Sequence, residues 1–120
     1  MRIAISATGR SLDTEVDQRF GCCQHFIIAD PETMEFEAVD NSGAMTAGGA
    51  GVSTAQMIAG KGVQAVFTGN CGPNAYQVLS SANIQVITGV SGTVKDVIEG
   101  YRLGKFQTSA QANVSSHSGM

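Results

Sequence analysis

Apolar and polar residues alternate near the start of the chain, which predicts a strand over 2–7. An apolar run at 26–29 is followed by the turn-like stretch 30–33, where Pro31 suits the second position of a turn. The next stretch, 34–39, alternates again, so we expect 26–29 and 34–39 to form an antiparallel hairpin. One face of its second strand is apolar and the other acidic, so one side should contact water; the apolar residues are Met34, Phe36 and Ala38.

The second half of the chain changes to helical spacing. A glycine-rich stretch leads to a predicted helix over 50–61, and a second helix should start at Pro73 and end at Asn83. A third should begin after Thr93, which with Asp96 resembles a capping box. Short apolar strands at 65–68 and 85–88 separate the helices, so these strands should be parallel with right-handed crossovers. The pattern as a whole predicts an α/β fold, with a mixed five-stranded sheet and about three helices.

Composition agrees with one compact domain of the 120-residue chain, which is 42% hydrophobic and 14% charged. We assign 1–106 to this domain and 107–120, which has no charged residue, to a disordered tail. The net charge of −3 and pI of about 5.1 give no basic surface for nucleic acid. No stretch reaches the ~20 apolar residues of a membrane span, and no signal peptide is evident, so we expect a cytoplasmic protein.

Three cysteines, Cys22, Cys23 and Cys71, are the first candidates for chemistry. An odd number without C-x-x-C spacing argues for free thiols in a reducing compartment. Thiolates are preferred ligands of iron–sulfur units, copper(I) and zinc. Adjacent cysteines in extended chain point to opposite sides, so one of Cys22 and Cys23 should face a shared site. The alternative is that each thiol is a small buried apolar group, and His25 is either a structural histidine or a ligand.

Glycine-rich segments at 48–51 and 69–74 both lead into predicted helices. Ligands of open α/β sheets bind beyond the carboxyl ends of parallel strands, where helix N-termini favour anions. Arg19 adds a guanidinium in the segment 17–25. The alternative interpretation is that both glycine segments are only tight turns. Neither segment has the Walker or the dinucleotide-binding pattern.

Evidence for catalysis is weak. No pair of carboxylates flanks the glycine segments, and the G-x-S-x-G nucleophile motif is absent. A Cys23–His25 pair could share one face of a strand and act as nucleophile and base, although no third group orients it. We therefore expect a binding protein rather than an enzyme.

Three strings occur in an order that resembles a known family: Asp17-x-Arg19-Phe20-Gly21, then Gly49-Ala50-Gly51-x-x-x-Ala55-Gln56, then Gly69-Asn70-x-Gly72-Pro73-Asn74-Ala75. They are similar to the dinitrogenase iron–molybdenum cofactor biosynthesis family, which includes NifX, the C-terminal part of NifB, NafY and the orange proteins. The resemblance covers about residues 1–106. It implies a ribonuclease-H-like fold without nuclease carboxylates.

The resemblance also implies that the protein carries or stores an anionic metal–sulfur cluster, held non-covalently: a molybdenum–copper sulfide or an iron–molybdenum precursor. Donor or acceptor proteins for the cluster, and a monomer or weak dimer, are expected with it. The residues expected to contact the cluster are Arg19, Phe20, Gly21, Gly48, Gly49, Gly51, Asn70, Gly72, Pro73 and Asn74, and the candidate metal ligands are Cys22, Cys23 and Cys71.

Two departures from the family pattern modify this expectation. Cys22 stands where members often have a basic residue, and Gly48 where many have histidine. The added thiols favour a softer metal such as copper. The alternative is a cofactor-free thiol redox or protein-interaction domain, which would be colourless where a metal sulfide absorbs visible light.

Overall fold

The structure is a computed structural model, and it describes residues 2–41 and 50–104. Gly48, Gly49 and the tail 107–120 lie outside these ranges, so the expectations for them stay predictions. None of the helices in the described part is long and apolar enough to cross a membrane.

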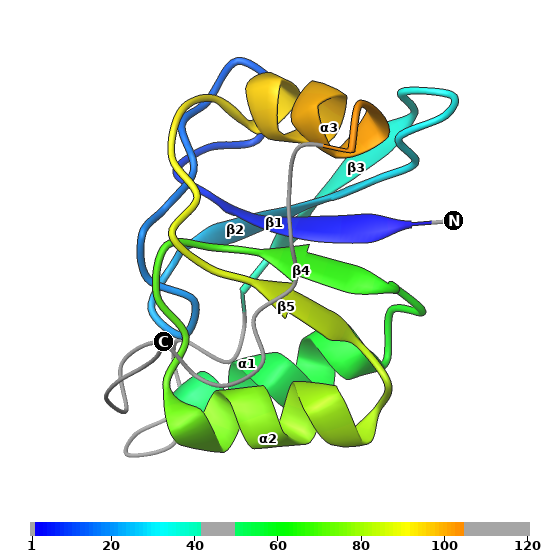
Figure 1. The fold of residues 1–120 in the computed structure, drawn as a ribbon. Coiled ribbons are helices and arrows are strands. Elements are labelled where there is room, and N and C mark those ends of the chain that lie inside the picture. Colours follow the sequence, from blue (N-terminus) through cyan, green and yellow to red (C-terminus); the bar gives the residue numbers. More distant parts are fainter. Residues whose placement is uncertain (1, 42–49, 105–120) are drawn as a thin grey trace.

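One mixed sheet of five strands forms the centre of the molecule, in the order β3-β2-β1-β4-β5 (Figure 1). β1 (Ile3–Ala7), β2 (His25–Ala29) and β3 (Phe36–Asp40) are antiparallel neighbours, with Ile5 opposite Ile27 and Ile27 opposite Ala38. β4 (Ala65–Phe67) and β5 (Gln85–Ile87) run parallel to β1. The predicted combination of an antiparallel hairpin with parallel strands is confirmed.

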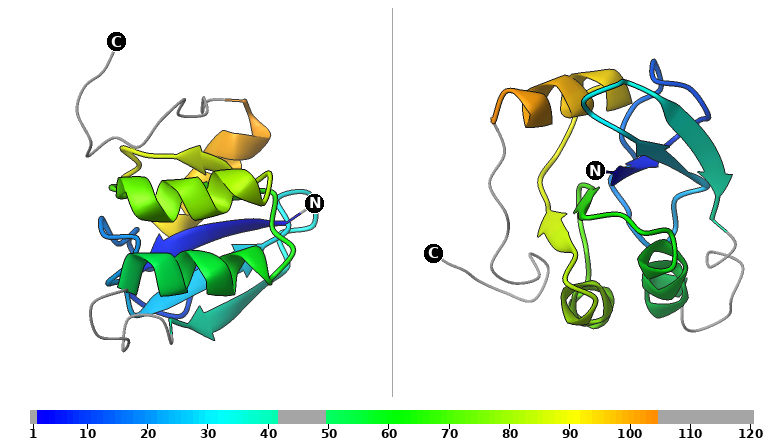
Figure 2. Two further views of the ribbon diagram at one scale, coloured as in Figure 1. Left: turned by 90° about the horizontal axis from the view of Figure 1, so that it is seen from below. Right: turned by 90° about the vertical axis from the view of Figure 1, so that its right-hand side faces the viewer.

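The three helices lie on both faces of the sheet (Figure 2). α1 (Ala50–Ala59) and α2 (Pro73–Ser81) lie side by side on one face, and α3 (Val94–Arg102) covers the other. Each face has its own apolar core, which explains why all five residues of β1 are buried. Ile58 and Leu79 belong to the first core, which also contains alternate residues of the strands.

The residues expected to mark the helix ends have the conformations and contacts that this role requires. Gly62 and Asn83 have positive φ of 73° and 62°, the left-handed conformation that ends helices. Thr93 caps α3, because its Oγ1 accepts a hydrogen bond from the backbone N–H of Asp96 at 3.2 Å.

The predicted strand 34–39 begins too early. Met34 has a φ of 65°, and its N–H donates to the carbonyl of Asp30 at 2.8 Å, so it belongs to the turn. β3 therefore starts at Phe36, whose side chain is 43% exposed at the end of the sheet, while Ala38 packs on the α3 face. The longer turn was not evident because a non-glycine residue rarely adopts positive φ.

The connections after β1, β4 and β5 emerge at one edge of the sheet, where all three helices begin (Figure 1). This edge is the carboxyl end of the parallel strands, where open α/β sheets bind ligands. The segments around Arg19 and Asn70 lie at this edge.

Candidate functional site

The candidate site is built on a pairing between two segments far apart in the sequence. Arg19 and Asn70 form a parallel β-bridge outside the main sheet. The N–H of Asn70 donates to the carbonyl of Gln18 at 2.8 Å, and the N–H of Phe20 donates to the carbonyl of Asn70 at 3.2 Å. The segment that carries Arg19 is therefore fixed beside the connection that leads into α2.

Gly69 allows this close approach. A Cβ at Gly69 would lie 2.7 Å from the Cα of Gln18, closer than a real Cβ contact permits. The side chain of Gln18 reaches over this point and donates through Nε2 to the carbonyl of Val90 at 3.0 Å. The connections after β1, β4 and β5 are thus held together at a position where only glycine fits.

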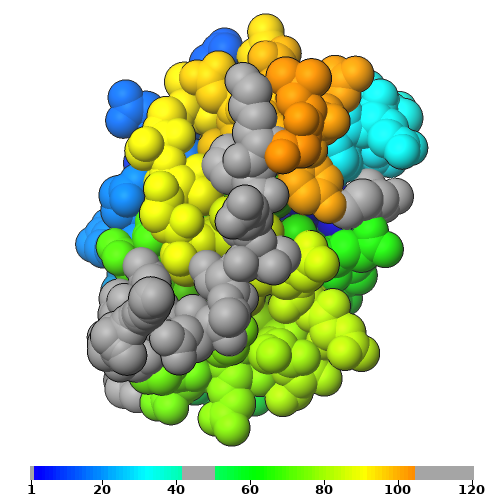
Figure 3. Space-filling view, viewed as in Figure 1, coloured from blue at the N-terminus to red at the C-terminus, as the bar shows by residue number. Residues whose placement is uncertain are grey.

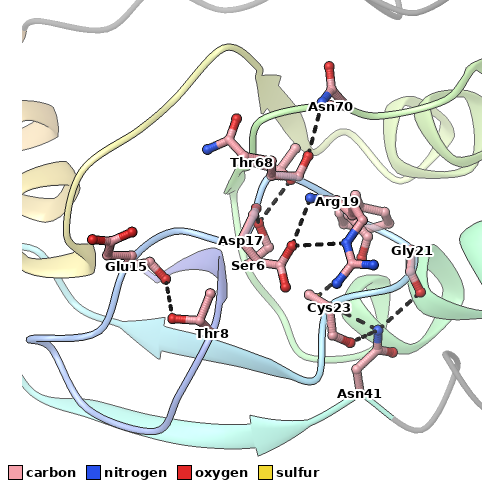
Figure 4. A network of polar contacts seen from close by, with 12 residues as sticks. Ser6, Thr8, Glu15, Asp17, Arg19, Gly21, Cys23, Asn41, Thr68 and Asn70 are labelled. Atoms are coloured by element: carbon pink, nitrogen blue, oxygen red, sulfur yellow. Dashed lines mark hydrogen bonds and ion pairs between the residues drawn. The ribbon is translucent and has the colours of Figure 1, made fainter.

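Arg19 is the cation of this surface, and Asp17 orients it (Figure 4). The buried carboxylate of Asp17 accepts from the backbone N–H of Arg19 at 3.0 Å and from its Nε at 3.4 Å. Ser6 fixes Asp17 in turn, because the Asp17 N–H donates to the Ser6 carbonyl at 2.8 Å and the Ser6 hydroxyl donates to the Asp17 carbonyl at 2.6 Å. The Arg19 side chain remains 67% exposed, and no described residue accepts from its terminal Nη groups. Those two nitrogens can bind an anion.

Two helix N-termini meet beside this segment. A Cβ at Gly51, the second residue of α1, would lie 3.7 Å from the Cβ of Ala75 in α2. The N-cap of α2 is Gly72, which gives no side-chain hydrogen bond to the helix, and Pro73 occupies the first turn. The first N–H groups of α2 therefore lack a capping side chain and favour an anionic partner. Asn70, Pro73 and Asn74 are exposed around them and Gly72 is half-buried.

Phe20 and Gly21, both expected to contact the cluster, differ in burial. The Phe20 side chain is 2% exposed and packs edge-on against Phe26, with ring centroids 5.4 Å apart. It anchors the loop in the core, so its predicted contact with a ligand would have to come from its backbone. Gly21 is half-buried, beside the exposed Cys22.

The three thiols are not equivalent. Cys22 is exposed, whereas Cys23 and Cys71 are buried in the core beneath α1 and α2. Burial, with the charge of Asp17 as a second cause, raises the pKa of Cys23 to about 12. Burial raises the pKa of Cys71 to about 11. At neutral pH these two thiols remain protonated in the metal-free protein, so a metal would have to displace a proton from each in order to bind it.

The described residues contain no group of three or more Cys, His, Asp or Glu side chains that could hold a metal ion. The thiols thus form no ligand set of this kind there. Cys22 and Cys23 do point to different environments, one exposed and one buried, although residues 20–22 form a turn and not the extended chain from which this was expected.

The proposed Cys23–His25 catalytic pair is wrong. Cys23 precedes β2, and its Sγ turns inward to donate to the Phe20 carbonyl at 3.3 Å. His25 starts the strand, and its Nδ1 lies 3.1 Å from Oδ1 of Asp40, the oxygen that also accepts from Arg10 at 2.7 Å. Cys23 packs in the core beneath α1 and α2, whereas His25 shares the face of β2 with Ile27, which belongs to the core beneath α3.

Asn41 and Thr54 are functional candidates that the sequence pattern did not reveal. Both are buried, and the Thr54 hydroxyl donates to Oδ1 of Asn41 at 2.9 Å. Asn41 in turn donates through Nδ2 to the carbonyls of Cys23 and Gly21, at 2.8 and 3.3 Å. An isolated Asn after a strand and a Thr within a helix give no local signal of such a network.

Two surface hollows lie away from this site, on either side of the β2–β3 turn. One of about 280 Å³ is lined by Arg2, Ile28, Asp30, Glu35, Phe36 and Glu37. The other, of about 430 Å³, lies between that turn and the end of α3, and the molecular surface there is seen in Figure 3. The chemistry of Arg19 and the helix N-termini is at the opposite end of the strands, so the hollows do not define the site.

Comparison with known proteins agrees with this architecture. Residues 1–104 match the family model described as dinitrogenase iron-molybdenum cofactor. The apo form of the orange protein from Desulfovibrio gigas is 38% identical, with a TM-score of 0.89 over 93% of this chain and 95% of that one. A NifB-type protein from Thermotoga is 33% identical, with a TM-score of 0.76 over 89% and 91%. An uncharacterised protein of Methanocaldococcus jannaschii is 29% identical over 110 residues, which cover 89% of this chain and 90% of that protein. The predicted family is therefore confirmed, and the chain belongs to the dinitrogenase iron-molybdenum cofactor family.

Proposed function

We propose that this protein binds an anionic metal–sulfur cluster as cargo, to store it or pass it to another protein, and catalyses no reaction on it. Membership of the iron-molybdenum cofactor family supports a role with a metal cluster. The similar orange protein is described in an apo form, which implies a bound component in its other form. A molybdenum- or copper-containing sulfide and an iron–molybdenum precursor are the cargo classes we propose.

The pairing of Arg19 with Asn70 is the observation that carries this proposal. It holds an exposed guanidinium beside the uncapped start of α2, which itself lies against the start of α1. Each charge-assisted hydrogen bond to an anion contributes about 1.5–3 kcal/mol. Several such donors together are enough to bind a polyanionic cluster with micromolar affinity, about −8 kcal/mol.

Covalent ligation has a secondary part in this proposal. Cys23 and Cys71 are buried and protonated at neutral pH, because burial raises the pKa of both thiols. Cys22 is the exposed thiol of the described chain and can add one soft contact to copper in a mixed cluster. Donor and acceptor proteins would meet the cargo at the same edge of the sheet.

The second candidate function is a cofactor-free thiol redox or interaction domain, and the exposed Cys22 is what favours it. A redox role within one chain needs a second accessible thiol, and Cys23 and Cys71 are 0% and 1% exposed. The candidate therefore depends on a disulfide between Cys22 and another molecule.

Anaerobic reconstitution distinguishes the two functions. The purified protein is mixed with tetrathiomolybdate, with and without copper(I), and separated by gel filtration at low and high salt. The cluster proposal predicts visible absorbance and molybdenum in the protein peak, both reduced at high salt because the binding is electrostatic. A colourless, molybdenum-free peak at low salt would reject it. Disulfide-linked Cys22 dimers, formed when cluster-free protein is then oxidised by air, would support the redox candidate.

A further inference from the structure

Asn41 makes three hydrogen bonds to the loop between Arg19 and β2. Its side chain donates to the carbonyls of Gly21 and Cys23, and its own backbone N–H donates to the carbonyl of Gln24 at 2.9 Å. Figure 4 shows the Asn41 amide directed at the backbone of this loop. A single buried residue therefore fixes three carbonyl groups within four consecutive residues.

These hydrogen bonds determine where the neighbouring N–H groups of the loop point. All peptide bonds of the described chain are trans, and in a planar trans peptide the C=O and the following N–H point in opposite directions. Since the carbonyls of Gly21 and Cys23 point inward to the buried Asn41, the N–H groups of Cys22 and Gln24 point away from it. Both of these residues are exposed, and neither N–H donates to an acceptor within the described chain.

Thr54 fixes the orientation of the Asn41 amide. Its hydroxyl lies 2.9 Å from Oδ1 of Asn41 and 3.3 Å from the carbonyl of Gly21. When it donates to the nearer Oδ1, the NH₂ end of the amide faces the carbonyls of the loop. Thr54 lies in α1, one turn after Gly51. The network thus connects the loop that carries Cys22 to the helix whose N-terminus adjoins α2.

We infer that Asn41 is a positioning residue for anion binding: it aims the N–H groups of Cys22 and Gln24 outward, on the loop that carries Arg19, as additional donors to the cargo. This inference rests on the proposed function and extends it, because it adds two backbone donors to the site. The donors come from a fixed loop, so their orientation needs no rearrangement when an anion binds.

The orientation is tested first without cargo. Relaxation enhancements of ¹⁵N-labelled protein by a neutral gadolinium chelate in solution report how near the N–H protons of Cys22 and Gln24 lie to solvent. We expect strong enhancement of both protons in the native protein, and Asn41→Ala to change it while the enhancements of β1 stay constant. Ile58→Val, which loses a buried methyl group in the same core, is the matched control and should change neither. Weak enhancement of the two N–H protons in the native protein, or unchanged enhancement in Asn41→Ala, would overturn the inference whether or not the protein binds a cluster.

The effect on binding is tested with tetrathiomolybdate. Asn41→Ala should weaken uptake about tenfold or more, since two charge-assisted donors are lost, whereas Ile58→Val should bind as the native protein does. Thr54→Val should also weaken uptake and Thr54→Ser should restore it, because serine keeps the hydroxyl; this pair serves if Asn41→Ala does not fold. Equal uptake by Thr54→Val, Thr54→Ser and native protein would reject the positioning role. Absence of uptake by the native protein would reject the proposed function and leave the relaxation enhancements as the test of orientation.

Discussion

Gly51 of α1 faces Ala75 of α2, so close that a Cβ at Gly51 would touch the Cβ of Ala75 at 3.7 Å. This is an ordinary van der Waals distance, and the structure has room for the methyl group. The two helix N-termini are therefore adjacent at a glycine that the packing itself does not require, and we expect an added methyl group to restrict the approach of an anion to this point.

Gly51→Ala should fold at least as stably as the native protein, with a gain of up to about 1 kcal/mol from the restricted unfolded chain. Uptake of tetrathiomolybdate should fall, because the methyl group separates the anion from the helix N–H groups. Gly60→Ala is the matched control: its Cβ would lie 3.5 Å from a backbone oxygen at the other end of α1, and uptake should not change. Thermal unfolding and a binding titration measure both effects.

Gly69→Ala should behave in the opposite way. Its methyl group would lie 2.7 Å from the Cα of Gln18, so the backbone has to move and the Arg19–Asn70 bridge should open. We expect a loss of about 1–3 kcal/mol, typical of overpacking. Hydrogen exchange of the Asn70 and Phe20 amides should become faster, and unchanged protection of both would show that the close approach is not required.

The thiols should differ in reactivity. In native protein at pH 8, a thiol reagent such as 5,5′-dithiobis(2-nitrobenzoate) should modify Cys22 rapidly and leave Cys23 and Cys71 unmodified, because both are buried. The denatured, unreduced protein should show three reactive thiols. A count of one after denaturation would mean that two of them form a disulfide.

Stability should decrease in alkaline solution. The pKa values of Cys23 and Cys71 rise from 9.0 to about 12 and about 11 in the folded protein. Above pH 9 the unfolded chain releases protons that the folded protein retains, so the free energy of unfolding falls as pH rises toward 11. Denaturant titrations from pH 8 to 11 should show this decrease, and Cys71→Ala should make it shallower whereas Cys22→Ser should not.

Much of the fold could be predicted because it depends on local pattern. Alternation placed β1 and the β2–β3 hairpin, helical spacing placed the three helices, and Asn83 and Thr93 marked helix ends through their own backbone preferences. Met34 was wrongly assigned to the strand 34–39, because its side chain gives no indication of a positive φ.

The site could be predicted only in part. Glycine segments before helices indicated the edge of the sheet, and the order of the motifs indicated Arg19. The contacts that hold Arg19, from Asp17 and Asn70, join segments far apart in the sequence or depend on burial. The burial of Asn41 and Cys23 could not be predicted either, because the neighbouring sequence does not show whether an amide or a thiol is buried or exposed.

We propose that Arg19 and backbone N–H groups, rather than thiolates, bind the cargo. The most direct measurement compares visible absorbance and molybdenum content after reconstitution with tetrathiomolybdate and gel filtration. Arg19→Ala should lose roughly tenfold or more in affinity, the equivalent of about 1.4 kcal/mol. Arg102→Ala, an exposed arginine at the end of α3, should bind as the native protein does. The triple variant Cys22→Ser, Cys23→Ser and Cys71→Ser should retain substantial colour; a colourless triple variant beside a fully loaded Arg19→Ala protein would show that the thiols ligate the cluster and would contradict this account.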